Sequence, residues 1–164
     1  MNTENERDVV WDFIKTNKLA VMATIAAEKN APEAALVYYT SDKDHKIFIA
    51  TAKDSRKLRN IEAHKHVALV IKHDSEATVL QLEGTAKIIT DKSIQANLLE
   101  EIAKVSNSDE RSSYFPPIIS LSSATHMEFV EITITWLKYS NFETHFPFII
   151  EGTPENAKKH LVSK

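Results

Sequence analysis

Six runs of strand length, rich in apolar and β-branched residues, follow one another along the chain and constrain its fold more than any other feature. They cover residues 19–27, 33–40, 46–51, 66–72, 77–89 and 126–140. Polar turns or short helical stretches join successive runs, which is typical of closely connected antiparallel strands. The last run has the length of either a strand pair or one long bent strand. Six strands with short helices at their edges predict a mostly β (α+β) fold, a small barrel that is closed or partly open.

Helical spacing marks three further stretches. Residues 4–16 and 91–105 place apolar residues at intervals of three and four, which predicts amphipathic helices. The third stretch, DSRKLRNIEAH at 54–64, predicts a short helix with Asp54 or Ser55 as its N-cap. Strands therefore dominate the predicted fold, and the helices lie before and between them.

Glycine is scarce and cysteine is absent, and both facts exclude classes of site. The chain has two glycines, Gly84 and Gly152, and no cysteine. A Rossmann fingerprint or a Walker loop needs several glycines for close approach to phosphate, so neither is present. Disulfides, thiolate catalysis and cysteine zinc sites are excluded as well. His64 and His66 straddle a helix end and a strand start, which disfavours a metal site, and Gly84 is expected to mark a bend or bulge.

Charge and hydropathy indicate no nucleic-acid or membrane partner. The formal net charge is −3, and no apolar run approaches the roughly 18 residues of a membrane span. The N-terminal residues are polar and acidic, without the apolar region of a signal peptide. We therefore expect a soluble, cytoplasmic protein with a single domain over residues 1–150, followed by a loose polar tail over 151–164.

The start of the short helix at 54–64 carries the strongest functional signal. The free N–H groups and aligned dipoles of a first helical turn attract anions, and helix stability alone favours Asp or Glu there. Arg56 and Lys57 stand in this turn instead, near the hydroxyl groups of Thr51 and Ser55. Arginine offers a planar fork for two phosphate oxygens, and lysine offers a point charge. Residue chemistry alone leaves two interpretations open, a phosphate seat and a charged surface turn.

Several sequence blocks carry a family resemblance. The blocks are MAT (22–24), ALVYYT (35–40), IFIATAKDSRKLRNIEAHKHVALVI (47–71), LEGTAKII (82–89) and ITITWLKYSNF (132–142). Together they resemble the pyridoxamine-phosphate-oxidase-like, FMN-binding split-barrel superfamily, in particular its small general-stress-protein-type members. The S-R-K-x-R-N block after a strand is the most specific of them, and the similarity is weakest over residues 100–125.

The resemblance implies a six-stranded split β-barrel that works as a homodimer, with two FMN sites built across the subunit interface. It implies that the flavin phosphate is held by Arg56 and Lys57, with Ser55 and Thr51 nearby. The remaining residues that it assigns to the cofactor are Ala50, Leu36, Val37, Tyr38, Tyr39, Gln81 and Trp136. Tyr38 and Tyr39 point to opposite faces of their strand, so one is expected to face the ligand and the other the core or interface. Trp136 is either part of a neighbouring subunit's flavin pocket or a core residue.

The chain also departs from the true pyridoxamine oxidases. Those enzymes carry a basic residue at each end of the strand over the flavin, where this chain has Ala34 and Tyr39, and no arginine-rich segment follows Trp136. We therefore expect an FMN-dependent oxidoreductase that acts on a small substrate or a nicotinamide, and not a vitamin B6 oxidase. The alternatives are a non-catalytic flavin-binding stress or redox protein, or a barrel that uses deazaflavin F420 or haem. No residue stands out as an acid, base or nucleophile, so the catalytic residues are unknown.

Overall fold

Eight strands and three helices form the described part of the chain, which comprises residues 3–72, 77–108, 126–143 and 147–162 of this computed structural model. The helices are α1 (Thr3–Thr16), α2 (Arg56–Ala63) and α3 (Lys92–Ser108). The strands are β1 (Leu19–Ile25), β2 (Pro32–Ser41), β3 (Ile47–Ala52), β4 (His66–Lys72), β5 (Thr78–Ile89), β6 (Met127–Asn141), β7 (Phe148–Gly152) and β8 (Lys158–Leu161). All the predicted helices and strands are present, and the last predicted run is the single long strand β6.

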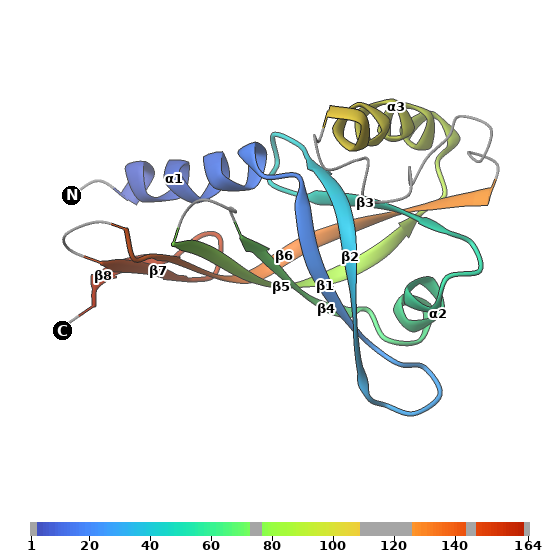
Figure 1. Cartoon of the computed structure of the whole chain (residues 1–164), viewed down its shortest axis with the longest axis horizontal. Helices are drawn as coiled ribbons and strands as arrows, with labels where there is room; N and C mark the ends of the chain where they lie inside the picture. Colours follow the sequence, from blue (N-terminus) through green and yellow to red (C-terminus); the bar gives the residue numbers. More distant parts are fainter. Residues whose placement is uncertain (1–2, 73–76, 109–125, 144–146, 163–164) are drawn as a thin grey trace.

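Six of the strands close into a barrel. Their order is β3–β2–β1–β4–β5–β6, each neighbouring pair is antiparallel, and β6 also pairs with β3. Each of the six strands therefore has a neighbour on both sides, which removes the exposed edges of an open sheet. This arrangement confirms the prediction of a mostly β, six-stranded split barrel. Figure 1 shows α1 and α2 toward opposite ends of the barrel and α3 lying over β3.

The last two strands form a hairpin beyond the barrel. β7 pairs with the end of β6, and β8 pairs with β7, so that Ile150 lies between Tyr139 and Lys159. Ile150 is buried in the core, and the Lys159 ammonium lies 4.0 Å from the centre of the Phe148 ring. The expectation of a loose tail from residue 151 is therefore wrong up to Leu161. The sequence does not predict β8, because all four residues of this strand are exposed and show no alternation of apolar and polar side chains.

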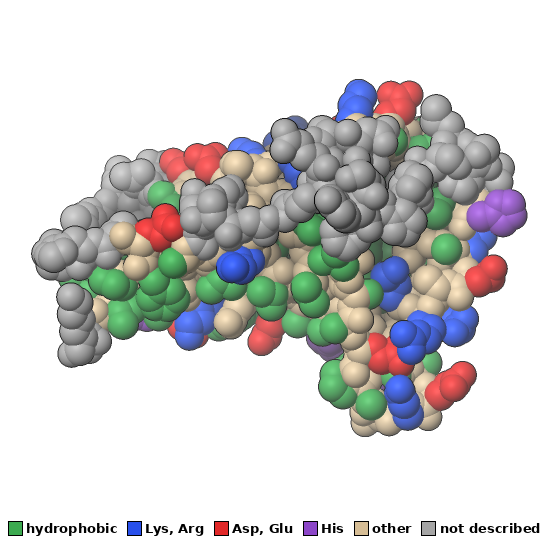
Figure 2. Space-filling model, viewed as in Figure 1, with side chains coloured by type: hydrophobic (Ala, Val, Ile, Leu, Met, Phe, Trp, Pro, Cys, Tyr) green, Lys and Arg blue, Asp and Glu red, His purple; other side chains and the backbone are tan. Residues whose placement is uncertain are grey.

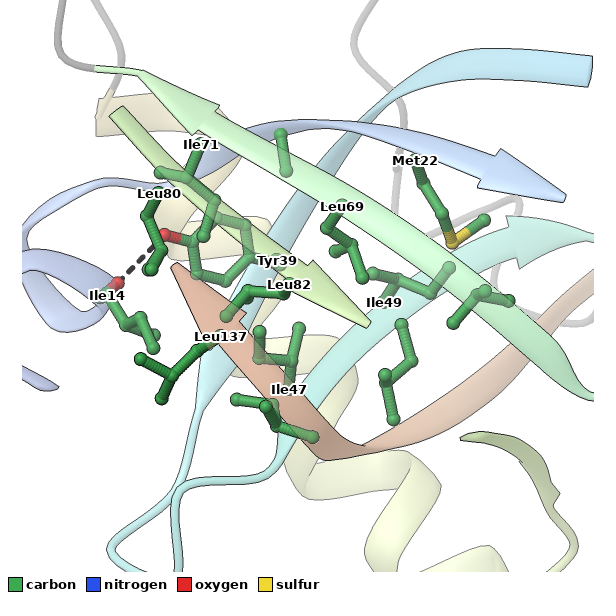
Figure 3. Close-up of a cluster of buried hydrophobic side chains, with 14 of the residues drawn as sticks. Ile14, Met22, Tyr39, Ile47, Ile49, Leu69, Ile71, Leu80, Leu82 and Leu137 are labelled. Carbon is green, nitrogen blue, oxygen red and sulfur yellow. Dashed lines mark hydrogen bonds between the residues drawn. The ribbon is translucent and has the colours of Figure 1, made fainter. Parts of the chain in front are cut away.

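Alternation along the barrel strands separates the core from the outer surface. In β4, Val67, Leu69 and Ile71 are buried, whereas Val70 between them is 43% exposed. Successive side chains of a strand point to opposite faces, so one register of the sequence fills the barrel. Ten of these core residues are labelled in Figure 3: Ile14, Met22, Tyr39, Ile47, Ile49, Leu69, Ile71, Leu80, Leu82 and Leu137.

The helices add to this core and cover part of the outer surface. Ile14 of α1 and Ile61 of α2 belong to the barrel core. Ile102 of α3 belongs to a second cluster on the outer side of β2 and β3, which includes Tyr38 and Phe48. Among the described helices, none has the length and apolar character needed to cross a membrane.

A bulge between β5 and β6 lies at the expected glycine. The register shifts between Glu83 and Gly84, which face Trp136 and Ile134 of β6, so Thr135 is the extra residue. A Cβ atom on Gly84 would lie 2.6 Å from the Thr133 carbonyl oxygen. Because that contact is with backbone, only glycine allows the two strands to approach so closely here. The sequence expectation of a bulge at Gly84 is confirmed.

Candidate functional site

The candidate site lies where β3 ends and α2 begins. Ser55 is the N-cap of α2, because its backbone is extended and its hydroxyl accepts a hydrogen bond from the Leu58 N–H at 3.2 Å. This settles which of the two predicted caps is used. Arg56 and Lys57 are consequently the first two helical residues, and α2 has no acidic residue in its first turn. The helix dipole therefore presents partial positive charge beside two cations, a combination that attracts an anion.

Two hydroxyl groups and one ammonium group converge at this point. The hydroxyl groups of Thr51 and Ser55 are hydrogen bonded at 2.8 Å, and Lys57 Nζ donates to Thr51 Oγ1 at 3.2 Å. Thr51 is buried, and burial lowers the pKa of Lys57. Among the described residues, no carboxylate pairs with the Lys57 ammonium. We call Thr51, Ser55, Arg56 and Lys57 the anion seat.

Arg56 differs from Lys57 because it already has an acidic partner. Its side chain is 74% exposed, and its Nη1 atom lies 3.4 Å from Glu33 Oε1. Lys29 reaches the same oxygen at 3.2 Å, while Asn60 Nδ2 donates to Glu33 Oε2 at 3.1 Å. The hydrogen bond from Asn60, followed by the contact with Lys29, holds the pKa of Glu33 below its usual value. The two cations of the seat are therefore unequal, because Arg56 meets a carboxylate and Lys57 meets none among the residues that the structure describes.

Sequence reasoning missed Glu33 and Asn60 as residues of this site. Asn60 is buried, its Oδ1 accepts the Ala27 N–H at 3.1 Å, and its Nδ2 also donates to Thr24 Oγ1 at 2.9 Å. It thereby ties α2 to the β1–β2 hairpin. A sequence signal existed, since Asn60 closes the S-R-K-x-R-N block and is polar on the inner edge of its helix beside Ile61.

The other predicted cofactor residues of β2 and β3 lie mainly in packed surroundings. Val37 and Tyr39 point into the barrel core, whereas Tyr38 and Ala50 belong to the cluster beneath α3. The expectation that Tyr38 and Tyr39 face opposite sides is confirmed. Burial raises the pKa of Tyr39, and its hydroxyl donates to the Ile14 carbonyl oxygen at 2.9 Å. A ligand outside the barrel could meet only the backbone of Val37 and Tyr39.

Leu36, Gln81 and Trp136 lie on the outer surface of the barrel instead. The pairing register aligns Leu36, Val21, Val70 and Gln81 across four neighbouring strands. Leu36 is 40% exposed, Val21 44% and Val70 43%. We call these four residues the outer row. Trp136 is half-buried and pairs with Glu83 on the same sheet. The structure thus divides the predicted site residues between the anion seat, the outer surface and packed positions.

Charged side chains gather around the seat. Figure 2 shows Lys and Arg side chains, with Asp and Glu among them, over α2 and the β1–β2 hairpin. Three of the basic residues there, Lys29, Arg56 and Arg59, line a hollow of about 260 Å³ together with Glu33 and Asn60. Fold and site together define the class of protein, a six-stranded split barrel with a cationic, hydroxyl-lined anion seat after its third strand.

The particular family follows from a sequence comparison. The family model described as pyridoxamine 5'-phosphate oxidase matches residues 7–140, and the chain belongs to this FMN-binding split-barrel family. A comparison with curated protein sequences found no match.

Solved structures share the fold at low sequence identity. The pyridoxamine 5'-phosphate oxidase-related, FMN-binding protein of Nostoc punctiforme has a TM-score of 0.63 at 10% identity, with 100% of both chains covered. A Clostridium acetobutylicum protein related to general stress protein 26 gives 0.63 at 17% identity, covering 93% of this chain and 96% of that one. General stress protein 26 of Bacillus anthracis gives 0.59 at 16% identity, covering 82% and 93%. These likenesses show the fold alone.

Proposed function

We propose that the chain is an FMN-binding protein whose anion seat holds the flavin 5'-phosphate. Lys57 would supply a point charge, Ser55 and Thr51 hydroxyl groups, and Arg56 a forked guanidinium. The observation that carries the proposal is the half-buried Lys57 ammonium, bonded to a hydroxyl group and without a carboxylate among the described residues. Burial of an uncompensated cation is unfavourable, and a phosphate dianion would reverse that cost. Membership of a family that often binds FMN supports the flavin phosphate as this anion.

A homodimer is the second part of the proposal. Three residues of the outer row, Val21, Leu36 and Val70, expose apolar side chains side by side on adjacent strands. A contiguous apolar surface of this kind is typical of an interaction site. The family resemblance implies a second copy as the partner, with Leu36, Gln81 and Trp136 close to the flavin ring. We therefore propose that two chains pair through this surface.

When bound, FMN would supply hydride transfer to or from a small substrate or a nicotinamide, and the chain would act as an oxidoreductase. The residues of the chain would bind the phosphate, orient the ring and shape the pocket. A second candidate is a non-catalytic flavin-binding stress or redox protein. The anion seat supports this candidate as well, because a site for the flavin phosphate serves a flavin-binding protein with or without turnover.

The first test is flavin retention and affinity. Purified protein is mixed with FMN, freed of excess and examined by absorbance, and the dissociation constant is measured by flavin fluorescence. Loss of one charge-assisted phosphate contact costs roughly 1.5–3 kcal/mol, so Lys57→Ala should weaken FMN binding by about one to two decades. Lys53→Ala is the matched control, because this lysine lies in the turn just before α2 but pairs with Glu128 at 3.6 Å.

Equal affinity of Lys57→Ala and wild type for FMN would overturn the phosphate seat. Retention of F420 or haem in place of FMN would mean that this barrel uses that cofactor. If FMN is retained, reduction of the bound FMN by NADH or NADPH at catalytic rates would support the oxidoreductase. If neither a nicotinamide nor another small reductant reduces it at such rates, the non-catalytic flavoprotein would be favoured.

A further inference from the structure

A carboxylate lies beside the anion seat and forms an ion pair with one of its two cations. Glu33, the second residue of β2, places Oε1 3.4 Å from Arg56 Nη1 and 3.2 Å from Lys29 Nζ. Its side chain is 18% exposed. Glu33 is thus an anion that the chain itself supplies to a hollow lined by Lys29, Arg56 and Arg59.

The position of this carboxylate is fixed by a buried side chain. Asn60 Nδ2 donates to Glu33 Oε2 at 3.1 Å, and Asn60 is itself held by Thr24 and by the Ala27 N–H. Asn60 is 4% exposed, so its amide does not swing freely. A carboxylate held in this way stays near Arg56, whereas a freely solvated glutamate would sample many orientations.

Glu33 treats the two seat cations differently. It contacts Arg56, but the Lys57 ammonium bonds to Thr51 and has no carboxylate contact among the described residues. A phosphate that enters the seat would therefore find Lys57 available and Arg56 already paired. It would also meet like charge from Glu33, because the guanidinium has to be shared or exchanged.

We propose that Glu33 is an internal competitor for Arg56 that lowers the affinity of the anion seat for the flavin phosphate. The inference rests on the proposed function, since it assumes that the seat binds FMN. Glu33 would then regulate cofactor retention, because Arg56 has to exchange the Glu33 carboxylate for the flavin phosphate when FMN binds. The chain would accordingly bind FMN less tightly than its set of cations alone would allow.

Glu33→Gln tests this directly, because the amide oxygen can still accept from Asn60 while the charge is removed. FMN affinity should rise by about three- to tenfold, the range expected from one exposed ion pair and one relieved like-charge contact. Riboflavin, which lacks the phosphate, should bind both proteins equally. Glu131→Gln is the matched control, since it removes a carboxylate paired with Lys46 at 2.9 Å and should leave both affinities unchanged.

A double-mutant cycle separates competition from mere structural support. If Glu33 acts through Arg56, Glu33→Gln should raise FMN affinity far less in an Arg56→Ala background. Circular dichroism and thermal unfolding verify that each variant is folded.

Three results would overturn the inference. Weaker FMN binding by Glu33→Gln would mean that Glu33 positions Arg56. A change of the same size in the affinities for FMN and riboflavin would mean that Glu33 acts on the fold. No change in either affinity, with FMN still bound weakly by Lys57→Ala, would remove the competitor and leave the phosphate seat intact. If wild type binds FMN no more tightly than riboflavin and Glu33→Gln does the same, the proposed function fails as well.

Discussion

Replacement of Tyr39 by phenylalanine tests whether this residue belongs to the core or to the cofactor site. Its ring is fully buried among the barrel strands, and its hydroxyl donates to the Ile14 carbonyl oxygen at 2.9 Å. Ile14 lies in the last turn of α1, whose carbonyl groups have no partners within the helix. Tyr39 therefore caps α1 from the barrel wall, and Figure 3 shows this contact as the dashed line.

Phenylalanine fills nearly the same volume, so the substitution removes the hydrogen bond without leaving a large cavity. A buried carbonyl group that loses such a side-chain donor costs about 1–3 kcal/mol. For a chain of 164 residues, each kcal/mol corresponds to roughly 2–4 °C in melting temperature. Tyr39→Phe should therefore melt about 2–12 °C below wild type, and FMN affinity should be unchanged, because no outside ligand reaches the phenol.

The assay is thermal unfolding followed by circular dichroism, combined with an FMN titration of the folded variant. Tyr139→Phe is the control, because Tyr139 is also buried in the core but its hydroxyl makes no hydrogen bond among the described residues. An unchanged midpoint for Tyr39→Phe would refute the capping argument. A loss of FMN affinity at unchanged stability would return Tyr39 to the cofactor site that the family resemblance implies.

Two further predictions concern the interface and the seat. Leu36→Glu puts a charge into the outer row and should convert a homodimer into monomers, as measured by light scattering after gel filtration. The control Val9→Glu, at a residue of α1 that is 39% exposed, should leave the dimer intact. If the Leu36→Glu variant is still a dimer, this surface is not the interface. The pH dependence follows from the pKa of Lys57, which burial lowers, so free Lys57 loses its proton at a lower pH than an exposed lysine. Bound phosphate favours the protonated form of Lys57, so FMN affinity should fall as the pH rises through that lowered pKa. Lys57→Arg should lessen this fall. Equal pH profiles of wild type and Lys57→Arg would refute the assignment of Lys57 to the phosphate.

Local chemistry explains how much of the fold could be predicted. β4 has the bounds that its alternation predicts, His66–Lys72, because one face is buried in the barrel and the other is not. The helix start after β3 could be read from Ser55 and the cations that follow it, and the bulge from Gly84. In each case a few neighbouring residues carry the whole signal. β8 could not be predicted, because neither of its faces is buried and its pairing with β7 is made by the backbone.

The candidate site divides in the same way. The sequence alone determined that Thr51, Ser55, Arg56 and Lys57 stand together, because five of the seven positions from 51 to 57, Lys53 included, carry hydroxyl or cationic groups at one helix start. Only the tertiary structure decided that Arg56 contacts a carboxylate, whereas Lys57 bonds to a hydroxyl group and meets no carboxylate in the part of the chain that the structure describes. Glu33 lies 23 positions from Arg56, and Ala27 lies 33 positions from Asn60, so closure of the barrel brings them together. Which side of β2 faces the core also depends on that closure, and it gives the adjacent residues Tyr38 and Tyr39 separate surroundings.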